Sequence, residues 1–187
     1  MTCFIELTQV EQHGSMYQDK MYNQIENYMT NVDEVMDLIH KYEHLFEERD
    51  GAKTFYTRYG DASLKQIHYY DMPQELTEAI FKTIPIKCTD RLNYCVNKYE
   101  PGDQIPKHKD SDGLYWMFKL IFLQADKPHF KYWDEQDKEH LVDEKPGALF
   151  NMRLGTPHAV TEIALDESPK YSICIMQGLD MYQRKVA

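Results

Sequence analysis

The sequence predicts an α+β protein that is mainly β, and three observations support this prediction. Apolar residues recur at helical spacing in the first half of the chain. From residue 91 onward, about seven or eight short apolar or alternating runs follow one another, separated by turn residues. The chain has 187 residues, of which 42% are hydrophobic, which is enough for one packed domain. Helices followed by many short strands indicate a sandwich or jelly roll with N-terminal helices packed on one sheet.

The N-terminal half, residues 1–90, is expected to support the strands that follow. Residues 17–48 show helical periodicity and predict two helices with a break near Thr30, because Asn31 and Glu34 have the spacing of a capping box. The run "DMPQELTEAIFKTI", which begins with an aspartate and an early proline, predicts another helix over 71–84. Between these segments, "RDGAKTFYTRYGDASLKQIHYY" predicts strands with turns at its glycines.

The C-terminal half supplies the sheet, and we expect its core to span residues 91–178 of a single domain covering 1–187. Turn residues end each of these runs after a few positions. The predicted strands are "LNYCVNKY", "YWMFKLIFLQ", "HFKYW", "HLVD", "ALFNMRL", "HAVTEIAL" and "KYSICIMQG".

Composition limits the classes of function. The chain has 21 basic and 31 acidic residues and a formal net charge of −10, which disfavours nonspecific binding to phosphate backbones. No run is long or apolar enough for a membrane span or a signal peptide. The cysteines contain no C-x-x-C pair, so we expect reduced thiols and a soluble, cytoplasmic protein; they are Cys3, Cys88, Cys95 and Cys174.

A candidate metal site begins in "PKHKDSDG". His108 and Asp110 are two residues apart, so on a strand both side chains point to one face and can reach one ion. Alone this pair is weak evidence, because H-x-D arises often by chance. His158 begins a later predicted strand, and two histidines with one carboxylate would occupy one face of an octahedral ion. Three positions would stay open, an arrangement suited to ferrous iron that binds a co-substrate and O₂.

These residues resemble the pattern of the 2-oxoglutarate/Fe(II)-dependent oxygenases, in which H-x-D is followed by a histidine and then a basic residue about ten positions later. The similarity covers roughly residues 91–178. It implies a double-stranded β-helix core, iron ligation by His108, Asp110 and His158, and O₂ and 2-oxoglutarate as co-substrates. It also implies that Lys170 pairs with the distal carboxylate of 2-oxoglutarate and that the Ser172 hydroxyl lies beside it.

Two further residues come from the same resemblance. The run "NKY" is similar to the N-x-Y that precedes H-x-D in the AlkB-type branch, which implies that Asn97 and Tyr99 hydrogen-bond the co-substrate. The chain departs from the common pattern because most members have arginine at the position of Lys170, and lysine offers a point charge without a bidentate fork. In JmjC-like proteins the lysine comes from the strand after H-x-D, which makes Lys119 a rival.

The expected activity is hydroxylation of a C–H bond, with succinate and CO₂ as co-products. A peptidyl or free amino-acid side chain such as proline is the preferred substrate class, so the expected partner is a peptide or a small molecule. Nucleobase hydroxylation or demethylation of the AlkB type is an alternative that the net charge disfavours. A non-enzymatic, cupin-like metal-binding module is another. No Gly-rich phosphate loop or G-x-S-x-G motif is present.

Overall fold

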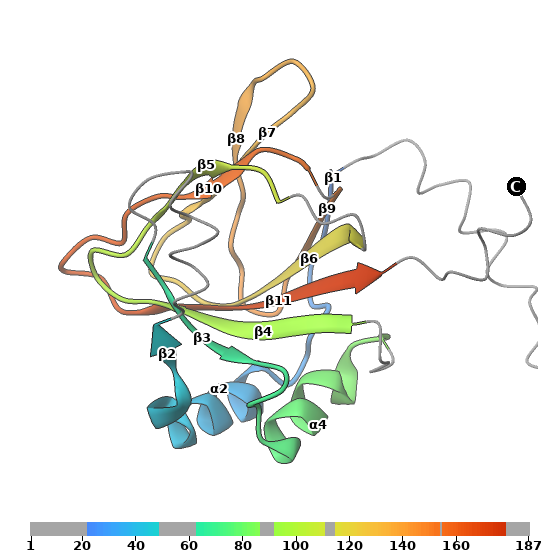
Figure 1. Cartoon of the computed structure of the whole chain (residues 1–187), viewed down its shortest axis with the longest axis vertical. Coiled ribbons are helices and arrows are strands. Elements are labelled where there is room, and N and C mark those ends of the chain that lie inside the picture. The colour runs from blue at the N-terminus through green and yellow to red at the C-terminus, as the bar shows by residue number, and fades with distance from the viewer. Residues whose placement is uncertain (1–21, 49–62, 87–91, 111–114, 154, 179–187) are drawn as a thin grey trace, which may run out of the picture.

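The described part of the chain contains two antiparallel β-sheets, two α-helices and one short 3-10 helix, Glu43–Leu45 (Figure 1). The structure is a computed structural model that describes residues 22–48, 63–86, 92–110, 115–153 and 155–178. The prediction of a mainly β chain with helices in its first half is therefore confirmed. No helix within these ranges is long and apolar enough to cross a membrane.

The large sheet has seven strands in the order β1-β9-β6-β11-β4-β3-β2. Its central strands are long, and most of their residues are buried. The continuous apolar runs in the sequence predict such strands. The strands are β1 (Tyr22–Ile25), β2 (Glu47–Glu48), β3 (Lys65–His68), β4 (Leu92–Tyr99), β6 (Tyr115–Gln124), β9 (Leu149–Arg153) and β11 (Lys170–Gly178).

The small sheet has four short strands in the order β5-β10-β7-β8. They are β5 (Ile105–His108), β7 (Phe130–Trp133), β8 (Glu139–Leu141) and β10 (His158–Val160). Figure 1 shows this sheet on one side of the large sheet, with the helices on the other side. A buried cluster that includes Ile105, Phe122, Phe130 and Val160 fills the space between the two sheets.

The two α-helices are α2 (Val32–Lys41) and α4 (Gln74–Thr83). Helix α2 begins after Asn31 as predicted, but the Asn31 side chain does not cap it. Its amide instead donates to Ala79 O (2.9 Å), and its Oδ1 accepts from the Thr83 hydroxyl (2.7 Å). Asn31 therefore joins the two helices. Buried side chains of both helices share a second cluster with Val96, Ile121 and Ile173 of the large sheet.

One predicted helix is wrong. Residues 22–25 form strand β1, which pairs antiparallel with β9, and no helix precedes Asn31 in the described part of the chain. The spacing of apolar residues permits a helix there, but pairing with a strand more than 120 residues away determines the outcome, since tertiary context overrides local periodicity. The predicted turns at Gly51 and Gly60 lie outside the described residues.

Candidate metal centre

The three predicted metal ligands meet at one end of the small sheet. His108 is the last residue of β5 and His158 is the first residue of β10, and the two are paired directly across these antiparallel strands. Asp110 follows two residues after β5 ends. Among the described residues, His108, Asp110 and His158 form the one group of three whose potential ligand atoms all lie within 4.8 Å of one another.

Each histidine is held by a backbone carbonyl. His108 Nδ1 lies 2.9 Å from Pro106 O, and His158 Nδ1 lies 2.9 Å from Thr156 O. Because a carbonyl only accepts, Nδ1 must carry the proton in both rings. In the neutral imidazole this leaves a lone pair on each Nε2, the atom that faces Asp110.

The spacing of the ligand atoms fits a divalent ion. His108 Nε2 lies 3.6 Å from Asp110 Oδ1, and His158 Nε2 lies 3.4 Å from Asp110 Oδ2. Metal bonds of about 2.1 Å at right angles place neighbouring ligand atoms about 3 Å apart. A small inward shift therefore brings all three atoms onto one face of an octahedral ion. Two imidazoles and one carboxylate are the donor set of non-haem Fe(II) sites.

Asp110 is suited to bind a cation because it stays ionised. Burial alone would raise the pKa of its carboxyl, but when the His108 and His158 rings are protonated, their hydrogen bonds and positive charges outweigh this effect and hold the pKa well below its usual range. The Asp110 side chain is 20% exposed, whereas those of His108 and His158 are almost fully buried. The carboxylate is therefore the ligand closest to solvent.

The residues predicted to bind 2-oxoglutarate lie on the face of the large sheet that is turned toward the small sheet, here called the inner face. On β11 this face carries Lys170, Ser172 and Cys174, of which Cys174 belongs to the cluster between the sheets. Lys170 and Ser172 are fully buried. The Ser172 hydroxyl has no hydrogen-bond partner among the residues that the structure describes.

Asn97 and Tyr99 lie beside them on β4. Asn97 is opposite Ser172 and Tyr99 is opposite Lys170 in the antiparallel pairing. Both are buried, and the Lys170 ammonium lies 6.0 Å from the centre of the Tyr99 ring. Asn97 Oδ1 accepts a hydrogen bond of 2.7 Å from the Gln66 amide. The four residues of the predicted co-substrate site are thus neighbours on two adjacent strands.

Lys119, the rival of Lys170, lies on the opposite face of the large sheet. On β6 it alternates with Phe118 and Leu120, which belong to the cluster between the sheets, and it shares a face with Ile121, which belongs to the helix cluster. Its ammonium donates to Asn151 Oδ1 (2.9 Å). The sheet therefore separates Lys119 from the three metal-ligand candidates.

Glu144 is a buried polar residue of this region that the sequence analysis missed. Its side chain forms an ion pair with Lys170, and the two side chains are 1% and 2% exposed. Burial lowers the pKa of Lys170, and the charge of Glu144 opposes this shift. The pair is 26 residues apart in the chain, and Glu144 stands in the acidic run "DEKPG", so no local signal distinguishes it from a surface residue.

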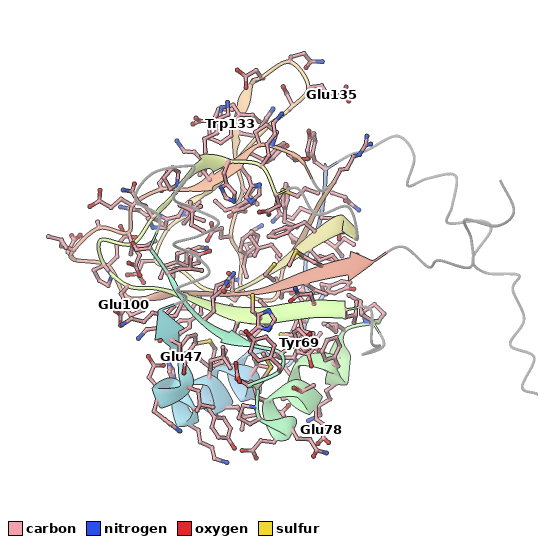
Figure 2. All side chains as sticks on the ribbon, viewed as in Figure 1. Glu47, Tyr69, Glu78, Glu100, Trp133 and Glu135 are labelled. Atoms are coloured by element: carbon pink, nitrogen blue, oxygen red, sulfur yellow. The ribbon has the colours of Figure 1, made fainter. Side chains whose placement is uncertain are left out.

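The hairpin of β7 and β8 borders the metal-ligand candidates. Figure 2 shows Trp133 and Glu135 on this hairpin, at the end of the molecule away from Glu78 of α4. Trp133 N–H donates to Pro157 O (2.9 Å), next to His158. Lys107, next to His108, places its ammonium 4.2 Å from the centre of the Trp133 ring and 2.8 Å from Asp137 Oδ1. Trp133 and Lys107 therefore contact each other beside the metal-ligand candidates.

The similarity of the chain to known proteins lies in its structure. By sequence, the chain matches no family model and no curated protein. By structure, it is similar to a Pseudomonas putida prolyl-4-hydroxylase at 16% identity and a TM-score of 0.65, over 88% of this chain and 96% of that one. It is also similar to a Trichoplax adhaerens prolyl hydroxylase in complex with a hypoxia inducible factor oxygen degradation domain peptide fragment, at 12% identity and a TM-score of 0.69, over 98% and 97%.

A further match is an oxidoreductase of the 2OG-Fe(II) oxygenase family from Burkholderia pseudomallei, at 11% identity and a TM-score of 0.58, over 95% of this chain and 93% of that one. The chain has the fold of the 2-oxoglutarate/Fe(II) oxygenases. The resemblance expected from the sequence is confirmed at the level of the fold, and a His-Asp-His triad that suits iron lies within it.

Proposed function

We propose that the chain is an Fe(II)- and 2-oxoglutarate-dependent dioxygenase that hydroxylates a C–H bond. One oxygen atom of O₂ enters the substrate and the other enters succinate as 2-oxoglutarate loses CO₂. The observation that carries this proposal is the convergence of His108, Asp110 and His158, with both Nε2 atoms facing the carboxylate, in a chain with the oxygenase fold. Its two sheets then correspond to a double-stranded β-helix, and 1–187 to one domain with its core over 91–178.

Each residue has a specific role in this proposal. His108, Asp110 and His158 hold the iron, which together with 2-oxoglutarate supplies the O₂-dependent chemistry. Lys170 and Ser172 bind the distal carboxylate of 2-oxoglutarate. The unpartnered Ser172 hydroxyl supports this role, because a buried hydroxyl without a partner is unfavourable unless a ligand satisfies it. The apolar cluster between the sheets keeps water away from the bound co-substrate.

Asn97 and Tyr99 line the same site from β4. Tyr99 lies opposite Lys170, so its ring forms an adjacent wall of the pocket that we propose for the co-substrate. Asn97 lies opposite Ser172, and its amide is oriented by the hydrogen bond from Gln66. We propose that these two residues position 2-oxoglutarate and that the Lys170 ammonium donates hydrogen bonds to its distal carboxylate.

The proposed substrate is a peptidyl or free amino-acid side chain, as in prolyl hydroxylases. Similarity to two prolyl hydroxylases, one of them in complex with a peptide, supports this class. The charges near the site also favour an amino-acid substrate over a nucleic acid. Lys107 is already paired with Asp137, and the overall charge is −10. A nucleic acid substrate would require a free basic surface there. Free, buried Cys95 and Cys174 are consistent with the proposed cytoplasmic location.

Anaerobic titration of the purified protein with Fe(II) and then 2-oxoglutarate tests the proposal. We expect a charge-transfer band near ~500 nm from the iron–2-oxoglutarate chelate. His158→Ala should abolish the band and Lys170→Ala should weaken it, while the control His44→Ala, an exposed histidine outside the site, should leave it unchanged. Succinate release with candidate peptides then identifies the substrate.

Two results would contradict the proposal. If iron binds to the wild-type protein but 2-oxoglutarate produces no band, a metal-binding module without oxygenase activity becomes the better explanation. If no iron binds, the triad has no metal-binding role.

A further inference from the structure

The ion pair between Lys170 and Glu144 has a consequence for the co-substrate, and this inference rests on the proposed function. The Lys170 ammonium lies among aromatic rings, 5.2 Å from the centre of Phe122 and 6.0 Å from that of Tyr99. Its carboxylate partner is Glu144, and both side chains are almost fully buried. A buried cation without a partner is strongly unfavourable, so Glu144 stabilises the charge of Lys170 in the absence of a ligand.

Glu144 is also fixed in place by the backbone of the small sheet. While Oε2 accepts from Lys170, Oε1 accepts from the backbone N–H of His129 (3.1 Å) and from that of Phe130. Both oxygens therefore have donors, and the backbone donors belong to the start of β7. Displacing the carboxylate would break all of these bonds inside an apolar cluster, so Glu144 stays beside Lys170 when a ligand enters.

The net charge of the Lys170–Glu144 pair, next to which the distal carboxylate of 2-oxoglutarate would bind, is therefore close to zero. Lys170 contributes one positive charge and Glu144 contributes one negative charge at the same position. The donors that remain for a ligand are the other N–H groups of Lys170 and the unpartnered hydroxyl of Ser172. A carboxylate can still be hydrogen-bonded there, but it gains much less Coulomb attraction than it would from an isolated lysine.

We propose that Glu144 determines specificity at the distal end of the co-substrate, because it neutralises Lys170 and reduces the preference for a dicarboxylic 2-oxo acid over a monocarboxylic one. The matched pair of ligands is 2-oxoglutarate and 2-oxovalerate. Both are five-carbon 2-oxo acids, and 2-oxovalerate has a methyl group in place of the distal carboxylate. Their ratio of dissociation constants isolates the contribution of that carboxylate.

The experiment measures both dissociation constants by calorimetry on the full chain loaded with Mn(II), a redox-inactive substitute for Fe(II). We expect the wild-type protein to prefer 2-oxoglutarate by less than about tenfold. Glu144→Gln keeps an oxygen for the two backbone donors and removes the charge. It should increase the preference at least about tenfold through tighter binding of 2-oxoglutarate, with 2-oxovalerate unchanged within about twofold.

Two controls accompany this variant. Glu162→Gln changes an exposed glutamate after β10 and should leave both constants unchanged. The double variant Glu144→Gln/Lys170→Met removes both charges and should remove the increase seen in Glu144→Gln, because the ammonium that attracts the distal carboxylate is gone. Circular dichroism and Mn(II) affinity establish that each variant is folded.

The measurements separate the role of Glu144 from the binding of iron and 2-oxoglutarate. A folded Glu144→Gln variant whose preference equals that of wild type overturns the inference and leaves the proposed function intact. If Glu144→Gln does not fold, the wild-type ratio still decides, since a preference for 2-oxoglutarate well above tenfold contradicts neutralisation of Lys170. If Mn(II)-loaded wild type binds neither acid, the proposed function fails and the inference fails with it.

Discussion

At the scale of single residues, two hydrogen bonds determine how the metal-ligand candidates are presented. The carbonyls of Pro106 and Thr156 accept from Nδ1 of His108 and His158, which fixes the tautomer and the orientation of each ring. Both carbonyls lie two residues before the histidine that they orient. Short-range backbone contacts in and next to β5 and β10 thus orient both Nε2 atoms so that each can bind an ion.

Ser172 offers a test at this scale. Its hydroxyl is buried without a partner in the described residues, so Ser172→Ala should change the free energy of unfolding by less than about 0.5 kcal/mol. If the hydroxyl binds the distal carboxylate, the same change should weaken 2-oxoglutarate binding about threefold, because one of the few hydrogen bonds to that carboxylate is lost. Chemical denaturation and calorimetry of the Mn(II)-loaded protein measure the two effects.

The control for this prediction is Ser168→Ala, which changes an exposed serine shortly before β11 and should alter neither quantity. Loss of stability in Ser172→Ala without any loss of 2-oxoglutarate affinity would assign the hydroxyl a structural role.

At the scale of elements, the turn before β9 connects the large sheet to the segment that leads into α2. Gly147 has φ +77°, its N–H donates to Phe122 O (2.8 Å), and its carbonyl accepts from Met29 N–H (3.0 Å). A Cβ at this position would lie 2.4 Å from Met29 O and 3.2 Å from Val32 Cγ2. The close approach of the two backbones therefore requires glycine.

We predict that Gly147→Ala destabilises the protein by about 2–4 kcal/mol, because left-handed strain and a clash with backbone act together. The matched control is Gly102→Ala in the turn between β4 and β5. Gly102 also has positive φ, +93°, but a Cβ there would meet no atom within 4 Å, so we expect a loss of about 1 kcal/mol. Equal losses in urea denaturation would show that the contact with Met29 does not matter.

Elements also show what the sequence can predict. Strands β4, β6 and β11 match the expected runs, because long stretches of buried residues flanked by turn residues have few alternatives. Strand β1 was mistaken for helix because its pairing with β9 is a long-range event that leaves no local pattern. The histidines and aspartate were predictable as a motif, whereas the partnership of Glu144 with Lys170 depends on the assembled sheets.

At the scale of the whole molecule, the large sheet separates two buried clusters. One lies between the two sheets and adjoins the metal-ligand candidates, and the other joins the large sheet to α2 and α4. Because alternating residues of the same strands serve the two clusters, the helix cluster and the cluster that adjoins the metal-ligand candidates lie on opposite faces of one sheet.

This separation predicts that a defect in the helix cluster costs stability without altering the metal centre. Leu76 of α4 is fully buried, and Leu76→Ala should lower the free energy of unfolding by about 2–5 kcal/mol. Mn(II) affinity of the folded variant should stay within about twofold of wild type. The control Leu165→Ala removes a side chain that is 85% exposed and should change stability by less than about 0.5 kcal/mol. A parallel loss of Mn(II) affinity would contradict the separation.

The pairing of His108 with His158 has a consequence for folding kinetics. The two residues are fifty positions apart, and they meet across strands of only four and three residues. Closing such a long loop is entropically costly and yields few contacts in return, so we expect this strand pair to form after the nucleus of long central strands. An ion bound by both histidines and Asp110 cross-links the last part of the chain to assemble, and its binding energy adds to the barrier against unfolding.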